Sequence, residues 1–410
     1  MKKIRILIVF TMLMFVFTTI SYGDLEDIER INVSDIKNEV SVETSKTIAN
    51  EPNINSRIGL IYDRKSGQVL FEKNGYKQSL MASTTKIMTA IVVVENSNLS
   101  DVVEVENKAA QTGGSRLGLK KNDKITINDL LYGLMMRSGN DAAVQLALSV
   151  GKSIPEFAQM MNSKALELGL KNTHFVVPHG LDIDGHYTTA YELAKIADYA
   201  LKNPKIKQIV SSKTHTVYIN NRPMIINNTN ELLGSLDGVY GVKTGFTNGA
   251  GRCLVTSCKR EGIDIITVVL GADTKKMRTA DSIKLIEYAN KNFNMIDIKE
   301  KVLDEFSKWK GLNENRITIN KGTAQMELEL EELEFDKMAV RNTQVDNIKV
   351  EVNSVYYFEA PVEEKCLVGN LKIMIGDDTI KVLNIYNKHR VEKKNVKNYM
   401  FEFLKVLNVT

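Results

Sequence analysis

The residues best suited to chemistry form three short motifs in a fixed order along the chain. Ser83-Thr84-Thr85-Lys86 places an amine one helical turn after a hydroxyl, so the two groups meet if this segment is helical. Ser138-Gly139-Asn140 adds a second hydroxyl and an amide, and Lys243-Thr244-Gly245 adds a second ammonium. A serine becomes an effective nucleophile only when a neighbouring group accepts its proton. The motifs therefore predict a site in which a serine is acylated without a histidine base.

Each motif residue has an expected role in such a site. Lys86 is the candidate base for Ser83, and burial together with the nearby cation of Lys243 is expected to lower the pKa of Lys86. Ser138 is placed to relay a proton to the leaving amine, and Asn140 to bind the peptide carbonyl of a substrate. A side-chain-free Gly245 on an edge-type strand is expected to let the substrate backbone approach closely.

These motifs are typical of the serine D-Ala-D-Ala carboxypeptidases, the low-molecular-mass penicillin-binding proteins, and the chain resembles that family from about Arg57 onward. Flanking segments that resemble it include Asp129-Leu130-Leu131-Tyr132-Gly133, Asn172-Thr173-His174-Phe175 and Pro178-His179-Gly180-Leu181. The resemblance implies an oxyanion hole made by the backbone N–H groups of Ser83 and Phe246. It also implies that Thr244, Thr247 and Arg278 grip the terminal carboxylate of the substrate. Arg278 is placed only by its distance after Lys243, and its alternative role is an exposed helix charge.

The pattern of apolar residues predicts the elements that position these motifs. Residues 57–72 read as a hairpin, a helix starts at Ser83, residues 240–271 form a three-strand meander, and residues 279–293 form a closing helix. This order, with the resemblance, predicts an α/β (α+β) penicillin-binding/β-lactamase-like transpeptidase fold, in which an antiparallel sheet carries an inserted helical lobe. Period-2 alternation after residue 297 predicts a small C-terminal all-β domain.

The expected domains are a catalytic serine D,D-peptidase domain (55–296) and a β-sandwich-like domain (297–388). Residues 24–54 are polar and predict a spacer, in which 33–42 is an alternative short helix. Residues 1–23 have a basic start, a short apolar core and small residues before Asp24, which is typical of a signal peptide. An uncleaved transmembrane anchor is the alternative, although the apolar run is short for a span of about 20 residues. We therefore expect an exported protein.

The C-terminal segment (389–410) predicts an amphipathic helix. Its apolar residues recur at helical spacing, with lysines around them: Val396, Tyr399, Met400, Phe403 and Leu407, then Lys393, Lys394, Lys397 and Lys405. Such a helix is typical of attachment to an anionic membrane surface, here the outer face of the cytoplasmic membrane. The alternative is a last helix packed on the β domain.

The charge balance, the cysteines and the spacing of metal-ligand residue types limit the possible partners and cofactors. The chain has 54 Lys and Arg against 50 Asp and Glu, a balance that gives no nucleic-acid footprint. Cys253 and Cys258 are five residues apart on a predicted strand, so they point to opposite faces and should not pair; Cys366 is in the other domain, and all three are expected to be reduced. A loop rich in metal-ligand residue types matches no standard zinc spacing, so no metal or organic cofactor is expected: His179, Asp182, Asp184 and His186.

The resemblance implies a D-alanyl-D-alanine carboxypeptidase that removes the terminal D-alanine from peptidoglycan stem pentapeptides through a Ser83 acyl-enzyme. The same serine should be acylated by penicillins and other β-lactams. A β-lactamase is disfavoured by the absence of a convincing Glu-x-x-Leu-Asn segment between the second and third motifs. A D,D-endopeptidase or transpeptidase stays open. The motifs are complete, which argues against a catalytically silent peptidoglycan-binding or β-lactam-sensing protein.

Overall fold

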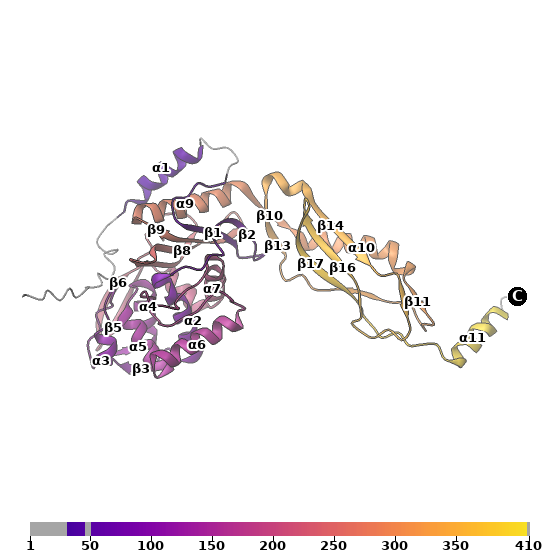
Figure 1. Cartoon of the computed structure of the whole chain (residues 1–410), viewed down its shortest axis with the longest axis horizontal. Helices are drawn as coiled ribbons and strands as arrows, with labels where there is room; N and C mark the ends of the chain where they lie inside the picture. Colours follow the sequence, from indigo (N-terminus) through magenta and orange to yellow (C-terminus); the bar gives the residue numbers. More distant parts are fainter. Residues whose placement is uncertain (1–30, 46–50, 408–410) are drawn as a thin grey trace, which may run out of the picture.

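The computed structural model describes residues 31–45 and 51–407, so the predicted signal peptide lies outside the described residues. Figure 1 shows two domains side by side along the longest axis of the molecule. The first combines a sheet with most of the helices. The second is narrower and rich in strands, and helix α11 (Val396–Leu407) lies beyond it.

The first domain is built on a five-stranded antiparallel sheet in the order β2-β1-β9-β8-β7. Its strands are β1 (Ile58–Asp63), β2 (Val69–Lys73), β7 (Val239–Thr247), β8 (Gly251–Arg260) and β9 (Ile263–Ala272). The predicted hairpin and meander are therefore present, and the two ends of the domain meet where β1 pairs with β9. The strand that carries Lys243 lies at the edge of the sheet.

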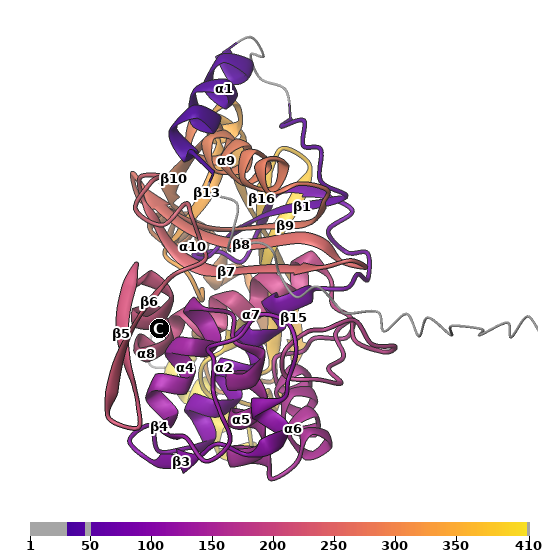
Figure 2. The ribbon, with the colours of Figure 1, turned by 90° about the vertical axis from the view of Figure 1, so that its left-hand side faces the viewer.

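Each face of the sheet is covered by helices, as Figure 2 shows. One face packs on α9 (Lys275–Asn292), and the other packs on the helical lobe. Cys253 lies in the core on the lobe side and Cys258 in the core on the α9 side. The prediction that these cysteines face opposite ways is confirmed, and Cys253, Cys258 and Cys366 form no disulfide within the described part of the chain.

The lobe surrounds α2, whose residues Ile87 to Val93 are all buried. Its helices are α2 (Lys86–Asn96), α3 (Asn107–Ala110), α4 (Ile127–Met136), α5 (Asn140–Gly151), α6 (Ile154–Glu167), α7 (Ala190–Lys202) and α8 (Pro204–Ser211). Two short hairpins flank them: β3 (Val102–Glu104) with β4 (Lys124–Thr126), and β5 (Thr214–Ile219) with β6 (Arg222–Asn227). Thr126 caps the start of α4, because its hydroxyl accepts the Asp129 N–H.

The segment predicted as a spacer contains α1 (Val33–Ser45), slightly longer than the helix considered for residues 33–42. Val33, Ile36 and Val40 are buried in the core on the α9 side of the sheet. Their spacing of three and four residues gives α1 one apolar face. The segment is therefore part of the domain rather than only a linker.

The second domain has one helix that the sequence analysis did not anticipate. Its main sheet runs β12 (Leu328–Leu330), β17 (Asp378–Asn387), β16 (Leu367–Ile375) and β14 (Ile348–Ser354). Two pairs complete it: β10 (Phe293–Asp297) with β13 (Lys337–Arg341), and β11 (Thr318–Asn320) with β15 (Tyr357–Glu359). Helix α10 (Ile298–Asn313) contributes Ile298, Val302 and Phe306 to the same core, so the domain is not purely β. Short 3-10 turns precede β11 and β14 (Glu314–Arg316 and Asn342–Asn347).

Candidate active site

The first motif has the geometry that the sequence predicts. Ser83 lies in a 3-10 turn (Ala82–Thr85) that leads directly into α2. The Lys86 Nζ is 2.8 Å from Ser83 Oγ, 2.7 Å from Asn140 Oδ1 and 2.8 Å from the His179 carbonyl oxygen. Lys86 is fully buried and Ser83 is only 7% exposed. The amine and the hydroxyl are therefore in direct contact and shielded from bulk water.

These three contacts differ in what they can offer a neutral Lys86. Two of its partners, the Asn140 amide oxygen and the His179 carbonyl, can only accept hydrogen bonds. Ser83 alone among the three carries a proton that it can donate. A neutral Lys86 therefore keeps N–H bonds to the two oxygens and turns its lone pair toward the Ser83 hydroxyl.

The second motif connects α4 to α5. Ser138 is buried and has a left-handed backbone (φ 58°), a conformation that costs a residue with a Cβ roughly 1 kcal/mol. Within the part of the chain that the structure describes, its Oγ has no hydrogen-bond partner. Asn140 begins α5, and its side-chain amide donates to the Gly113 carbonyl at 2.8 Å. Strain and an unpaired hydroxyl are both typical of a functional position.

The third motif brings the edge strand against the nucleophile. Lys243 is buried and its Nζ donates to the Thr244 carbonyl at 2.8 Å. A Cβ added at Gly245 would lie 2.9 Å from the Ser83 backbone nitrogen. The glycine was predicted to make room for the substrate backbone. The structure gives a different reason, because the close neighbour is the turn that carries Ser83.

The residues after this motif have contacts that the sequence did not predict. The Phe246 ring stacks on the Arg252 guanidinium, with the guanidinium carbon 4.5 Å from the ring centroid. Thr247 donates its hydroxyl proton to Asp182 at 2.6 Å and accepts the Ala250 N–H at 3.0 Å. The Thr247 hydroxyl thus ties the β7–β8 turn to the neighbouring loop, and its proton is already in use.

Arg278 lies on α9 and is fully buried, so the alternative of an exposed helix charge is wrong. Its guanidinium forms an ion pair with Glu231, which also accepts the Thr279 hydroxyl at 2.6 Å. Burial opposes ionisation of Glu231, but Arg278 and the Thr279 hydrogen bond outweigh it and hold the pKa of Glu231 below its usual value.

The loop 178–186 is a part of the site to which sequence reasoning gave no role. The Pro178 carbonyl accepts the Thr89 hydroxyl at 2.6 Å, one turn of α2 beyond Lys86. A Cβ at Gly180 would lie 1.9 Å from the Ala82 carbonyl oxygen, so a side chain there would collide with the turn that carries Ser83. The Pro-His-Gly-Leu segment was noticed as a family resemblance, but hydrogen bonds made by carbonyl groups leave no signal in residue type.

The histidines of this loop pack against the first motif. His186 Nδ1 accepts the Val176 N–H at 3.0 Å, so its Nε2 carries the proton and donates to Thr85 Oγ1 at 2.8 Å. Burial lowers the pKa of His186 to about 4 and that of His179, which also feels the Lys86 charge, to about 3. Both rings are neutral near pH 7. Among the described residues, no group of three or more His, Cys, Asp or Glu is arranged to hold a metal ion.

These pKa values predict that the folded protein becomes less stable as the pH is lowered. Between pH 6.5 and 4 the unfolded chain binds a proton at position 186 that the folded chain does not, which costs about 1.4 kcal/mol per pH unit. Urea unfolding at pH 7.0 and pH 5.0 measures this loss. His186→Gln should reduce the slope of the unfolding free energy against pH by the contribution of about one proton. Equal slopes in wild type and His186→Gln would contradict the assignment.

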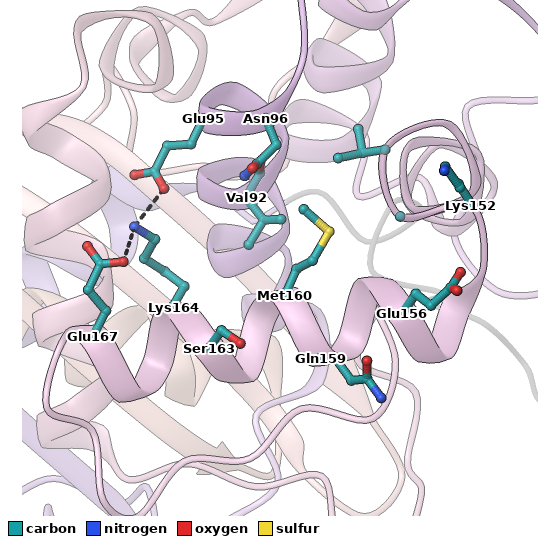
Figure 3. A pocket seen from close by; sticks show the side chains of 12 residues that line it. Val92, Glu95, Asn96, Lys152, Glu156, Gln159, Met160, Ser163, Lys164 and Glu167 are labelled. Atoms are coloured by element: carbon teal, nitrogen blue, oxygen red, sulfur yellow. Dashed lines mark hydrogen bonds and ion pairs between the residues drawn. The ribbon is translucent and has the colours of Figure 1, made fainter.

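A hollow of about 670 Å³ lies on the lobe at the C-terminal end of α2 (Figure 3). Lys164 crosses it and bridges Glu95 at 2.8 Å and Glu167 at 2.7 Å. None of the motif residues lines it. The three motifs instead meet where β7 packs against the turn that carries Ser83.

The fold and the contact between Ser83 and a buried lysine are typical of a class of serine acyl-transferring enzymes in which a lysine replaces histidine beside the nucleophile. The family description "D-alanyl-D-alanine carboxypeptidase" matches residues 45–274. The chain belongs to this family of serine peptidases, which includes the low-molecular-mass penicillin-binding proteins.

Individual relatives agree with this assignment. The chain is 38% identical to the D-alanyl-D-alanine carboxypeptidase DacF of Bacillus subtilis over 57% of this chain, a match that spans 62% of that relative's own length. It is 32% identical to DacD of Salmonella typhimurium over 80% of this chain and 84% of that protein. Penicillin-binding protein 5 of Haemophilus influenzae superimposes with a TM-score of 0.70 at 26% identity, covering 84% of this chain and all of that one. The Streptomyces K15 DD-transpeptidase superimposes with a TM-score of 0.56 at 35% identity, covering 58% of this chain and 98% of that one.

Proposed function

We propose that this protein is a serine-type D-Ala-D-Ala carboxypeptidase that removes the terminal D-alanine from peptidoglycan stem pentapeptides. The observation that supports it most directly is the contact between buried Lys86 and Ser83. The family gives the substrate class, because its members are named for cleavage at D-alanyl-D-alanine.

Acylation follows from the hydrogen bonds of Lys86. Neutral Lys86 accepts the Ser83 proton while Ser83 Oγ attacks the carbonyl carbon of the penultimate D-alanine. The negative charge moves to the carbonyl oxygen, which faces the backbone N–H groups of Ser83 and Phe246. Collapse of this intermediate breaks the peptide bond, and the leaving amine takes the proton from Lys86 by way of Ser138. The products are an ester on Ser83 and free D-alanine.

Deacylation reverses these roles. Water enters where the amine left, Lys86 takes one of its protons, and the hydroxide attacks the ester. Ser83 leaves as the alcohol and recovers the proton. A β-lactam acylates Ser83 by the same first step, but its amine stays attached to the acyl group and continues to occupy the place where water would enter.

Binding of the substrate's terminal carboxylate is assigned to Thr244 and Arg278. Thr244 is on the edge strand, and its hydroxyl is 2.8 Å from that of Thr229. Because the Thr247 hydroxyl is already bonded to Asp182 and to the Ala250 N–H, we assign Thr247 to positioning the β7–β8 turn.

The direct test is to incubate purified residues 24–410 with a stem pentapeptide and to measure free D-alanine. Release of one D-alanine per peptide, and its complete inhibition by penicillin, is the expected result. A peptide that stays intact while penicillin still labels the protein would favour a penicillin-sensing role instead.

We also propose that the protein is exported and held at the membrane by α11. None of the α11 residues is buried against the rest of the chain, in contrast to the alternative of a helix packed on the β domain. Its exposed apolar side chains include Phe401 (66%) and Phe403 (64%), and lysines lie on either side of them. Among residues 31–45 and 51–407, no helix combines the length and the apolar character that crossing a bilayer requires. A helix lying in the bilayer interface fits these features.

Removal of residues 396–410 should release the protein from vesicles containing anionic lipid without lowering turnover of a soluble peptide. The cut falls after the last buried residue of the β domain, Val391, so the domain keeps its core. Co-sedimentation with vesicles measures binding. The variant F401S/F403S keeps every charge and should also lose binding. Unfolding or loss of activity in the truncated protein would show that the helix is structural.

A further inference from the structure

One short segment touches both residues assigned to carboxylate binding. Thr229 bonds to the Thr244 hydroxyl, and two residues later Glu231 pairs with Arg278. Between them, the Asn230 side chain donates to the Gly241 carbonyl on β7 at 3.0 Å. The segment is therefore fastened to the edge strand, and Glu231 is held in place at the guanidinium.

The ion pair neutralises a cation that lies wholly inside the protein. The Arg278 side chain is 0% exposed and that of Glu231 is 14% exposed. At such burial the interaction between the charges is only weakly screened by water. A ligand carboxylate that approaches Arg278 therefore meets a guanidinium whose charge is already compensated.

The pairing also leaves part of the Glu231 carboxylate unused. Arg278 and Thr279 both donate to Oε1. Oε2 is buried and accepts no hydrogen bond from any residue that the structure describes. This is not the bidentate arrangement in which both carboxylate oxygens accept from the guanidinium. The pair is therefore open to competition from another carboxylate.

We propose that Glu231 is a specificity-determining residue: it acts as an internal carboxylate that weakens the demand for a free carboxylate at the C-terminus of the substrate. The inference rests on the proposed role of Arg278. The substrate class that it adds is peptides in which the carboxyl group of the terminal D-alanine is blocked as an amide. A guanidinium without an internal partner would discriminate more strongly between a free carboxylate and an amide at the end of the substrate, since a hydrogen bond to a charged group contributes about 1.5–3 kcal/mol.

The experiment compares kcat/KM for a stem pentapeptide with that for the same peptide ending in a carboxamide. Wild type is expected to prefer the free acid by less than about tenfold. Glu231→Gln removes the internal charge and should raise this preference by about tenfold or more. Glu231→Asp keeps the charge and should stay near the wild-type ratio. Glu39→Gln, which breaks an exposed ion pair with Lys276 on α9, is the matched control and should change nothing.

The possible outcomes distinguish a failure of the role proposed for Glu231 from a failure of the proposed carboxypeptidase function. Because an unpaired buried arginine is destabilising, thermal melts accompany each variant, and the wild-type ratio tests the proposal even if Glu231→Gln does not fold. A wild-type preference above about a hundredfold, or an unchanged ratio in Glu231→Gln, overturns the role of Glu231. If Arg278→Gln also keeps the wild-type ratio, the carboxylate role of Arg278 fails as well. If neither peptide releases an alanine product, the proposed carboxypeptidase function itself is wrong.

Discussion

Replacement of Ser83 by alanine is expected to abolish covalent labelling by penicillin and to leave the fold intact. The wild-type protein should gain the mass of one drug molecule, on the peptide that contains Ser83. The loss should be complete because no other group takes over an absent nucleophile. The thermal melt should change little, since the substitution removes one oxygen from a side chain that is 7% exposed.

Mass spectrometry of the intact protein and of its peptides measures this result. Ser307→Ala is a suitable control, because Ser307 is exposed and also precedes a lysine by three residues, Lys310. It should label like wild type. Label that persists on another residue of the Ser83→Ala protein would overturn the assignment of the nucleophile.

The second large effect is expected at Lys86, where arginine should nearly eliminate acylation. Arginine keeps the positive charge but does not give up a proton in proteins, so it cannot act as the base for Ser83. The loss should reach about a thousandfold or more, within the range of 10²–10⁴ attributed to general base catalysis. The acylation rate by a chromogenic β-lactam measures it directly.

Lys243→Arg is the matched comparison. Lys243 is also a buried lysine of the three motifs, but its proposed contribution is charge rather than proton transfer. It should keep far more acylation than Lys86→Arg. Equal losses in the two variants would mean that the base is misassigned.

The contact between Ser83 and Lys86 could be predicted from the sequence, because residue type and spacing determine it. A serine and a lysine three apart at a helix start must lie on one face, and the structure places their side chains in contact. The sheet was predictable for a related reason, since strands 239–272 alternate or run apolar between clear turns. The signal for α10 was also present, in the four-residue spacing of Ile298, Val302 and Phe306, but the charged residues between them obscured it.

The rest depended on contacts that residue types do not encode. His179 holds Lys86 through its backbone carbonyl, which any residue could supply. The family resemblance implied a role for Thr247 in gripping the substrate carboxylate, and the structure shows its hydroxyl bonded to a carboxylate 65 positions earlier in the chain. The partner of Arg278 is likewise 47 residues away. Long-range pairs of this kind arise from the packing of α9 and loops against the sheet, which one sequence does not specify.

The complete burial of Lys86 and Lys243 has a consequence for how this site can be found experimentally. Amine-directed reagents modify a lysine only when they can reach it, so surface lysines should consume such reagents first. Surveys that rank lysines by reactivity would therefore pass over Lys86 and Lys243, the two lysines assigned to the active site. A probe that acylates serine is expected to label Ser83 and to report the site without modifying either lysine.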